Sequence, residues 1–246
     1  MIRYRHQIVL GTMLIICSVI VYIAHYFIFR DPHHIFIYLV GDIAFVFIEV
    51  LLVTLIIHQV LSEHEKQTRL QKLNMVIGVF FSEVGTELLT IFSDTDPALG
   101  TISSTLVDKG IFEAETFDRA RKHLLTFDYK INISHIDLSE LRAFLTERRN
   151  FLLRLLENPN LLEHESFTEL LRAVFHLTEE LYHREIFAGL PETDLEHLAN
   201  DCNRAYKLLA AEWVDYMKHL RDNYPYLFSL SVRTNPFDRT ASAVVI

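Results

Sequence analysis

Two long apolar runs lie near the N-terminus, at residues 8–29 and 35–57, and each is longer than 20 residues. A helix rises about 1.5 Å per residue, so 20 residues reach across a hydrocarbon core of about 30 Å. The pattern therefore predicts two transmembrane helices. The lipid bilayer is the first expected partner of the chain.

The segment between the two runs, residues 30–34, contains Pro32 and has room only for a tight turn. The two helices should therefore form an antiparallel hairpin. Basic residues flank the outer ends of the hairpin, whereas Arg30 in the turn is offset by Asp31. The positive-inside bias then places both termini in the cytoplasm and the hairpin in an inner or plasma membrane. The flanking residues are Arg3, Arg5, Lys66, Arg69 and Lys72.

The first apolar run also has an alternative interpretation, as a cleavable signal peptide preceded by a basic segment. The run is longer than the apolar core of such a peptide, and no small-residue cleavage site follows it. These two features favour a retained membrane anchor.

Residues 61–96 are predicted to extend the second span as a juxtamembrane helix, because no proline occurs between residues 35 and 96. This helix either continues unbroken to about residue 92 or kinks near Ser62. An apolar stripe with spacings of three and four follows one face, and small residues follow an adjoining face. Both faces pack either inside their own domain or between subunits of a homo-oligomer. The stripe comprises Leu70, Leu73, Ile77, Phe80, Val84 and Ile91, with Glu87 at the missing position, and the small-residue row comprises Asn74, Gly78, Ser82 and Gly85.

Residues 97–246 are predicted to form a cytoplasmic helical domain that ends in a tail. The segment 93–136 is typical of a loop with one helix at about 113–126. Three helices follow, and their apolar faces should bury the core of a bundle. The aromatic segment 224–237 should dock on this bundle or on a neighbour. The capping boxes that open the three helices are Asp137-x-x-Glu140, Ser166-x-x-Glu169 and Thr193-x-x-Glu196.

The predicted fold class is therefore all-α, with a transmembrane hairpin at residues 1–60, the juxtamembrane helix and a helical bundle. The net charge of −9 belongs entirely to residues 61–246, because acidic and basic residues cancel in residues 1–60. A domain this acidic is not expected to bind nucleic acid. Two widely separated cysteines, Cys17 and Cys202, provide no disulfide framework. Because no nucleotide-binding, zinc-protease or serine-nucleophile motif occurs, we expect neither an enzyme nor a cofactor.

Asp42 and Glu49 are carboxylates inside the second apolar run, seven residues apart and thus on one helix face within about 20°. Ionised carboxylates that face lipid are costly, so this face should meet protein or water. One interpretation is an oligomeric cation or proton pathway, narrowed by Val53 and Ile56 on the same face. The other is a pair of protonated or hydrogen-bonded carboxyl groups that lock the hairpin.

Glu180-x-x-His183 matches the Glu-x-x-His element of di-iron helix bundles, and Asp194-x-x-His197 is a looser copy. A complete di-iron site would need two further glutamates from other helices. His176, seven residues before His183, is typical of a solvated or pH-sensitive position. We therefore expect no bound metal. If one binds, Glu180, His183, Asp194 and His197 are its candidate ligands.

These patterns favour a non-enzymatic, homo-oligomeric membrane protein whose cytoplasmic domain is an assembly or regulatory module. One alternative is a small cation channel with the second span lining the pore. Another is a membrane-tethered di-iron protein. The sequence identifies no protein partner.

Overall fold

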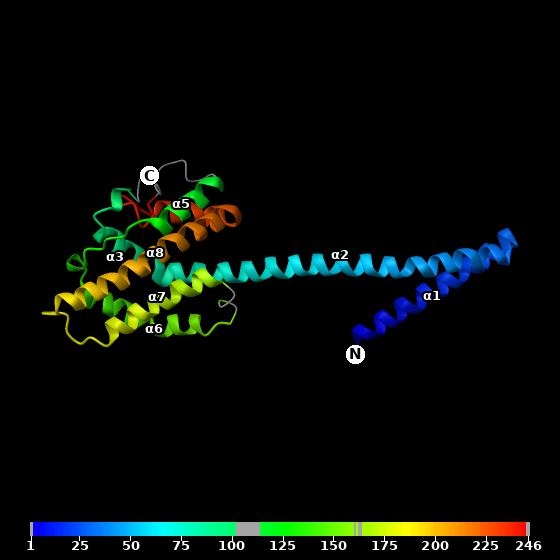
Figure 1. Cartoon of the computed structure of the whole chain (residues 1–246), viewed down its shortest axis with the longest axis horizontal. Helices are drawn as coiled ribbons and strands as arrows, with labels where there is room; N and C mark the ends of the chain where they lie inside the picture. Colours follow the sequence, from blue (N-terminus) through cyan, green and yellow to red (C-terminus); the bar gives the residue numbers. More distant parts are fainter. Residues whose placement is uncertain (1, 102–113, 160, 162–163, 245–246) are drawn as a thin grey trace. The chain divides into compact units, whose positions relative to one another are not determined.

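The computed structural model of the chain describes residues 2–101, 114–159, 161 and 164–244, and within them it leaves the side chains of residues 2–8, 34, 64–65, 67–70 and 114–116 undescribed. All regular elements in these ranges are helical, which confirms the predicted all-α class (Figure 1). The chain divides into two compact units, Met1–Gln67 and Thr68–Ile246. The second unit therefore takes in most of the segment that we expected to be a separate juxtamembrane helix.

The N-terminal unit contains α1 (Ile2–Phe29) and the first part of α2 (Pro32–Phe80). α1 ends at Arg30, whose φ of 51° is left-handed and whose N–H donates to the Tyr26 carbonyl at 2.8 Å. α2 then begins directly with Pro32, a residue suited to the first position of a helix. The break between the helices is thus two residues long, shorter than the predicted turn at residues 30–34.

In the part of the chain that the structure describes, three helical segments are long and apolar enough to cross a membrane: Val9–Phe29, Ile35–Glu63 and Gln71–Thr95. The apolar windows of Val9–Phe29 and Ile35–Glu63 have no buried residues, whereas 44% of the window in Gln71–Thr95 is buried. The third segment packs into the core of the C-terminal unit. Helical hydrogen bonding also continues through Ser62, where we had considered a kink.

A π-helical segment, η1 (Phe81–Gly85), joins α2 to α3 (Thr86–Thr95). A π turn accommodates one extra residue, so the buried face is displaced by one position beyond it. Phe92 is therefore fully buried, whereas Ile91, the predicted stripe position, is only half-buried. Most of the stripe lies in the core of its own chain, although the side chain of Leu70 is outside the described residues. The buried positions are Leu73, Ile77, Phe80, Val84, Leu88, Leu89 and Phe92.

The bundle of the C-terminal unit is built around α8, the longest of its helices. α8 packs against α5, α7, α9 and α3, and α6 packs against α7 (Figure 1). The core between them is aliphatic and aromatic, with Phe167, Leu145 and Tyr206 almost fully buried. The helices are α5 (Ala114–Thr126), α6 (Leu138–Leu156), α7 (Glu165–Tyr182), α8 (Glu192–Asn223) and α9 (Pro225–Arg233), and a 3-10 turn, η2 (Ile133–His135), precedes α6.

One of the three predicted caps is confirmed: Asp137 Oδ1 accepts from the N–H groups of Ser139 and Glu140 at the start of α6. The prediction for α7 is wrong, because Nδ1 of His164 caps this helix by accepting from the Phe167 N–H at 3.3 Å. Thr193 does not cap α8 either. The carbonyl of Pro191 accepts the first helical N–H groups there, and no side chain caps the helix.

The C-terminal tail docks on the bundle of its own chain. Ser93 Oγ donates to the Pro236 carbonyl at 2.7 Å, and Phe237 is buried beside Trp213 and Tyr206. The tail also contains the helix α9, which the sequence pattern did not predict. A nine-residue element behind Pro225 is too short to show a clear helical period.

Candidate metal centre

Four potential ligands come together where α7 and α8 lie side by side. His176 and Glu180 are four residues apart on α7, and His197 and Asp201 are four residues apart on α8. Side chains at this spacing share one face of a helix. The two facing pairs thus place two imidazoles and two carboxylates in one cluster.

The distances within the cluster are short and similar. Asp201 Oδ2 lies 3.4 Å from Nε2 of His176 and 3.4 Å from Nε2 of His197. Glu180 is 3.8 Å from His176 through Oε1 and 3.6 Å from His197 through Oε2. One ligand atom each from His176, Glu180 and His197 lies within 4.8 Å of the others.

Asp201 is the buried member of the cluster, with only 4% of its side chain exposed. Its Oδ2, the atom between the two imidazoles, accepts no hydrogen bond from any described residue. Its Oδ1 faces Arg204 Nη2 at 3.8 Å. Because a buried carboxylate oxygen normally has a partner, Oδ2 needs either donation from an imidazole N–H or a cation between the two rings.

Arg184 holds the other acidic groups of this region. It donates to Glu180 Oε2 at 2.7 Å and forms a two-pronged pair with Asp194 at 2.7 and 2.9 Å. These hydrogen bonds hold the pKa of Glu180 and that of Asp194 below their usual values. Glu180 is therefore ionised at neutral pH, and its Oε1 is directed away from this bond.

The structure brings together two of the four predicted ligands. Glu180 and His197 belong to the cluster, whereas Asp194 is engaged by Arg184. His183 caps the end of α7, is 73% exposed and approaches Glu179 at 4.0 Å instead of Glu180. The arrangement thus differs from the predicted Glu-x-x-His pairing.

Sequence reasoning missed Asp201 and did not place His176 in the site. The signal that could have found both residues is the repeated spacing His176-x-x-x-Glu180 and His197-x-x-x-Asp201. Two such pairs on neighbouring helices can surround one point, but only if the helices face each other along these sides.

A hollow of about 560 Å³ adjoins the cluster on the surface of α7 and α8. His176 forms part of its wall, together with the cationic side chains of Arg172, Arg204 and Lys207. The hollow leaves the imidazole of His176 accessible to solvent. A small ion or ligand in the hollow can therefore contact the imidazole of His176.

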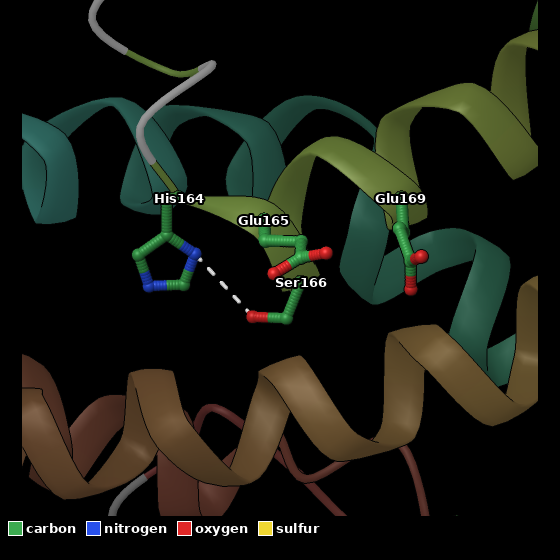
Figure 2. A pocket seen from close by; sticks show the side chains of 4 residues that line it. All are labelled: His164, Glu165, Ser166 and Glu169. Atoms are coloured by element: carbon green, nitrogen blue, oxygen red, sulfur yellow. Dashed lines mark hydrogen bonds between the residues drawn. The ribbon is translucent and has the colours of Figure 1, made fainter.

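A second hollow lies at the start of α7 and is lined by His164, Glu165, Ser166 and Glu169 (Figure 2). In this view the Ser166 hydroxyl points to Nδ1 of His164, and the two atoms are 3.4 Å apart. The same Nδ1 caps α7, so these side chains have a structural role in starting the helix. Nearby Glu212 is almost fully buried, and this burial raises its pKa.

The remaining predicted positions do not belong to the cluster. Asp42, Glu49, Val53 and Ile56 are all exposed on α2 in the N-terminal unit. Gly78 faces Tyr216 of α8, and Gly85 is buried beside Phe80 and Phe81. Among the small residues, Ser82 alone is exposed, while Asn74 is half-buried.

Both parts of the chain match models of known protein families. A family model described as the N-terminal helical domain of MJ1433 matches residues 2–61. A second, described as the C-terminal helical domain of the uncharacterized protein MJ1433, matches residues 69–233. The protein described as "Uncharacterized protein MJ1433" from Methanocaldococcus jannaschii is 49% identical over 234 residues, which cover 95% of this chain and 94% of the relative. No solved structure matches the chain.

Proposed function

This chain belongs to the MJ1433 family, and we propose that it is an integral membrane protein whose two N-terminal helices anchor a cytoplasmic helical domain. In this proposal the C-terminal domain is an assembly or regulatory module, and the anchored protein is a homo-oligomer in an inner or plasma membrane. Both termini lie in the cytoplasm.

The observation that carries the proposal is the exposure of α1 and the first part of α2. Neither apolar segment is buried in the structure, although the C-terminal unit has a closed core of its own. Burying one Leu, Ile or Phe side chain is worth about 1.5–3 kcal/mol. Two segments made almost entirely of such residues are therefore far more stable in lipid than in water.

A non-enzymatic module agrees with the character of the C-terminal domain. Its core is filled by apolar side chains from α2 to the tail, and its surface carries the net negative charge of the chain. Such a domain suits binding and assembly, because a rigid helical scaffold presents its outer faces to a partner. The subunits are held in one plane by their anchors, which raises their effective concentration.

Membrane anchoring is tested by extraction of membranes that contain the untagged full-length protein. We expect the chain to stay in the pellet after alkaline carbonate and to enter the supernatant only with detergent. Release by carbonate, with a monodisperse protein in the absence of detergent, would contradict the proposal. Light scattering of the detergent-purified protein should give a mass of more than one chain, and a monomer would refute the homo-oligomer.

The topology is tested by cysteine labelling in a Cys17→Ser, Cys202→Ala background. A cysteine introduced at His33, in the first turn of α2, should react with a membrane-impermeant maleimide on intact cells. One introduced at Glu147, which is exposed on α6, should react only after permeabilisation. The reverse pattern would place the domain outside the cytoplasm.

A cation pathway is the second candidate, and Asp42 and Glu49 carry it. Both carboxylates are exposed on one apolar helix and form no salt bridge within the described ranges. In liposomes, the wild-type protein should conduct cations, and Asp42→Asn with Glu49→Gln should abolish the flux. Glu63→Gln, at the end of the apolar segment, is the matched control and should retain it. Wild-type flux equal to that of empty liposomes would exclude this candidate.

A further inference from the structure

We propose that His176, Glu180, His197 and Asp201 bind one divalent transition-metal ion of the Zn²⁺ class between α7 and α8. This inference goes beyond the proposed anchoring and does not depend on it, because all four residues belong to the C-terminal unit. It concerns a mononuclear site, unlike the di-iron arrangement that the sequence pattern allowed.

The spacing of the ligand atoms fits a tetrahedral site. Zinc bonds to histidine nitrogen and carboxylate oxygen are about 2.0–2.2 Å long, so neighbouring ligand atoms of a tetrahedron lie about 3.3–3.6 Å apart. The two distances from Asp201 Oδ2 to the imidazoles are 3.4 Å each. Glu180 approaches His176 through Oε1 at 3.8 Å and His197 through Oε2 at 3.6 Å, so its side chain must rotate to bring one oxygen close to both imidazoles.

The buried carboxylate of Asp201 is independent support for a ligand at this point. Its side chain is only 4% exposed, and within the described ranges its Oδ2 accepts no hydrogen bond. An ionised oxygen in this position is costly unless a positive charge lies next to it. A metal ion between Asp201 and the two imidazoles supplies that charge.

The types of ligand select the class of ion. Imidazole nitrogens favour Zn²⁺ and related transition metals, whereas Mg²⁺ and Ca²⁺ favour sites made of oxygen alone. Arginines hold the outer oxygens of both carboxylates, as Arg184 contacts Glu180 Oε2 and Arg204 faces Asp201 Oδ1. Such outer contacts orient the ligands of metal sites.

The competing explanation is a cluster of ion pairs without a metal, in which protonated imidazoles face the two carboxylates. Both explanations place His176 and His197 next to Asp201. They differ in stoichiometry and in response to metal, because only a metal site binds one Zn²⁺ per chain and gains thermal stability from it.

The test uses the full-length protein in detergent, with any affinity tag removed and with metal stripped by a chelator. Calorimetric titration with Zn²⁺ at pH 7.5 should give one site per chain. His176→Ala and His197→Ala, which replace half-exposed side chains, should each raise Kd at least about tenfold, as even outer-shell changes do at metal sites. Asp201→Asn should do the same, provided that its circular dichroism spectrum is that of the wild type.

His183→Ala is the matched control, because His183 lies on the same helix but points to Glu179. It should leave the Zn²⁺ affinity unchanged. Co²⁺ in place of Zn²⁺ should give the intense visible absorption of tetrahedral coordination, and His176→Ala should remove it.

Three results would overturn the proposal. One is the absence of saturable binding of Zn²⁺, Co²⁺, Fe²⁺ and Mn²⁺. Another is binding that His176→Ala and His197→Ala leave intact, which would mean adventitious sites elsewhere among the 13 histidines. The last is binding of two ions per chain that His183→Ala abolishes, which would restore the di-iron arrangement.

Discussion

The side-chain amide nitrogen of Asn74 lies 3.0 Å from Nδ1 of His219 and joins the end of α2 to α8. The amide of Asn223 lies 3.1 Å from the same imidazole nitrogen. Because an amide N–H can only donate, Nδ1 of His219 serves as an acceptor and the ring is neutral. Burial also lowers the pKa of His219, against the opposing effect of Asp222.

The first prediction follows from this lowered pKa. A histidine whose pKa is lower in the folded state contributes stability above its unfolded pKa of about 6.5, and this contribution is lost as the pH falls below that value. His219→Gln keeps an acceptor and cannot be protonated. Between pH 7.5 and pH 5.5 the Tm of this variant should therefore fall less than that of the wild type. His183→Gln is the control, and an equal effect there would contradict the assignment.

Gly85 provides a second prediction, because its backbone lies against two aromatic rings. A Cβ at this position would come within 2.5 Å of Phe81 Cδ1 and 3.0 Å of Phe80 Cε1. Gly85→Ala should therefore destabilise the protein by about 1–3 kcal/mol in urea unfolding. A Cβ at Gly78 would come within 3.3 Å of the Tyr216 hydroxyl oxygen and 3.4 Å of its ring, so Gly78→Ala should have a smaller effect, since alanine also favours the helix. Equal losses would refute the close approach at Gly85.

Tyr206 provides a third prediction. Its ring is fully buried, and its hydroxyl makes no hydrogen bond within the described part of the chain. Tyr206→Phe should therefore raise the free energy of unfolding by about 1 kcal/mol, because it removes an unpaired buried polar group. Thr178→Val is the opposite case: the buried Thr178 hydroxyl donates to the Val174 carbonyl at 2.8 Å, so its loss should destabilise. A destabilised Tyr206→Phe would show that the hydroxyl has a partner in solution.

The fourth prediction concerns Arg184, which holds Glu180 and Asp194 by hydrogen bonds that lower their pKa values. An acid with a lowered pKa stabilises the fold above its unfolded pKa and loses this contribution as the pH falls. Arg184→Gln should reduce stability at pH 7 by at most about 1 kcal/mol, because the pairs are partly solvated. The difference from the wild type should disappear near pH 3. Lys130→Gln, which breaks an exposed pair with Asp128, should show no such pH dependence.

The Arg184→Gln variant also tests the proposed metal site, through its effect on the Glu180 carboxylate. Removal of Arg184 frees Oε2 of Glu180, which lies 3.6 Å from His197. If the site binds Zn²⁺, Arg184→Gln should raise the Kd for Zn²⁺ in the same calorimetric titration, because Arg184 orients Glu180. An unchanged Kd would mean that Glu180 is not a ligand or does not need Arg184.

Much of the fold could be predicted from the sequence, because local signals mark it. Proline and the acceptor side chain of Asp137 set the limits of α6, and apolar periodicity identified its buried face. The caps of α7 and α8 were misplaced because Ser166 and Thr193 lie inside the first helical turn. The first helical N–H groups bond to acceptors that precede these residues: the His164 ring at the start of α7 and the Pro191 carbonyl at the start of α8.

The candidate site was only partly predictable, because its ligands come from two helices. A motif within one helix pairs Glu180 with His183, but α7 ends at that histidine and turns its ring toward Glu179. Which face of α8 meets α7 is decided by the packing of the whole bundle. This packing buries Asp201 and brings His197 over Glu180, and neither result has a signal in local spacing.

Because η1 accommodates an extra residue, the buried positions of α2 and those of α3 do not follow one common seven-residue repeat. A helix with a uniform seven-residue repeat would have presented one straight seam, the geometry that two parallel copies need to coil around each other. The π turn at Phe81–Gly85 interrupts that seam inside the bundle, beyond the buried positions Leu73, Ile77 and Phe80. Deletion of exposed Ser82 would remove that extra residue, so the two parts could join as one regular α-helix with Leu88 and Phe92 still facing the interior.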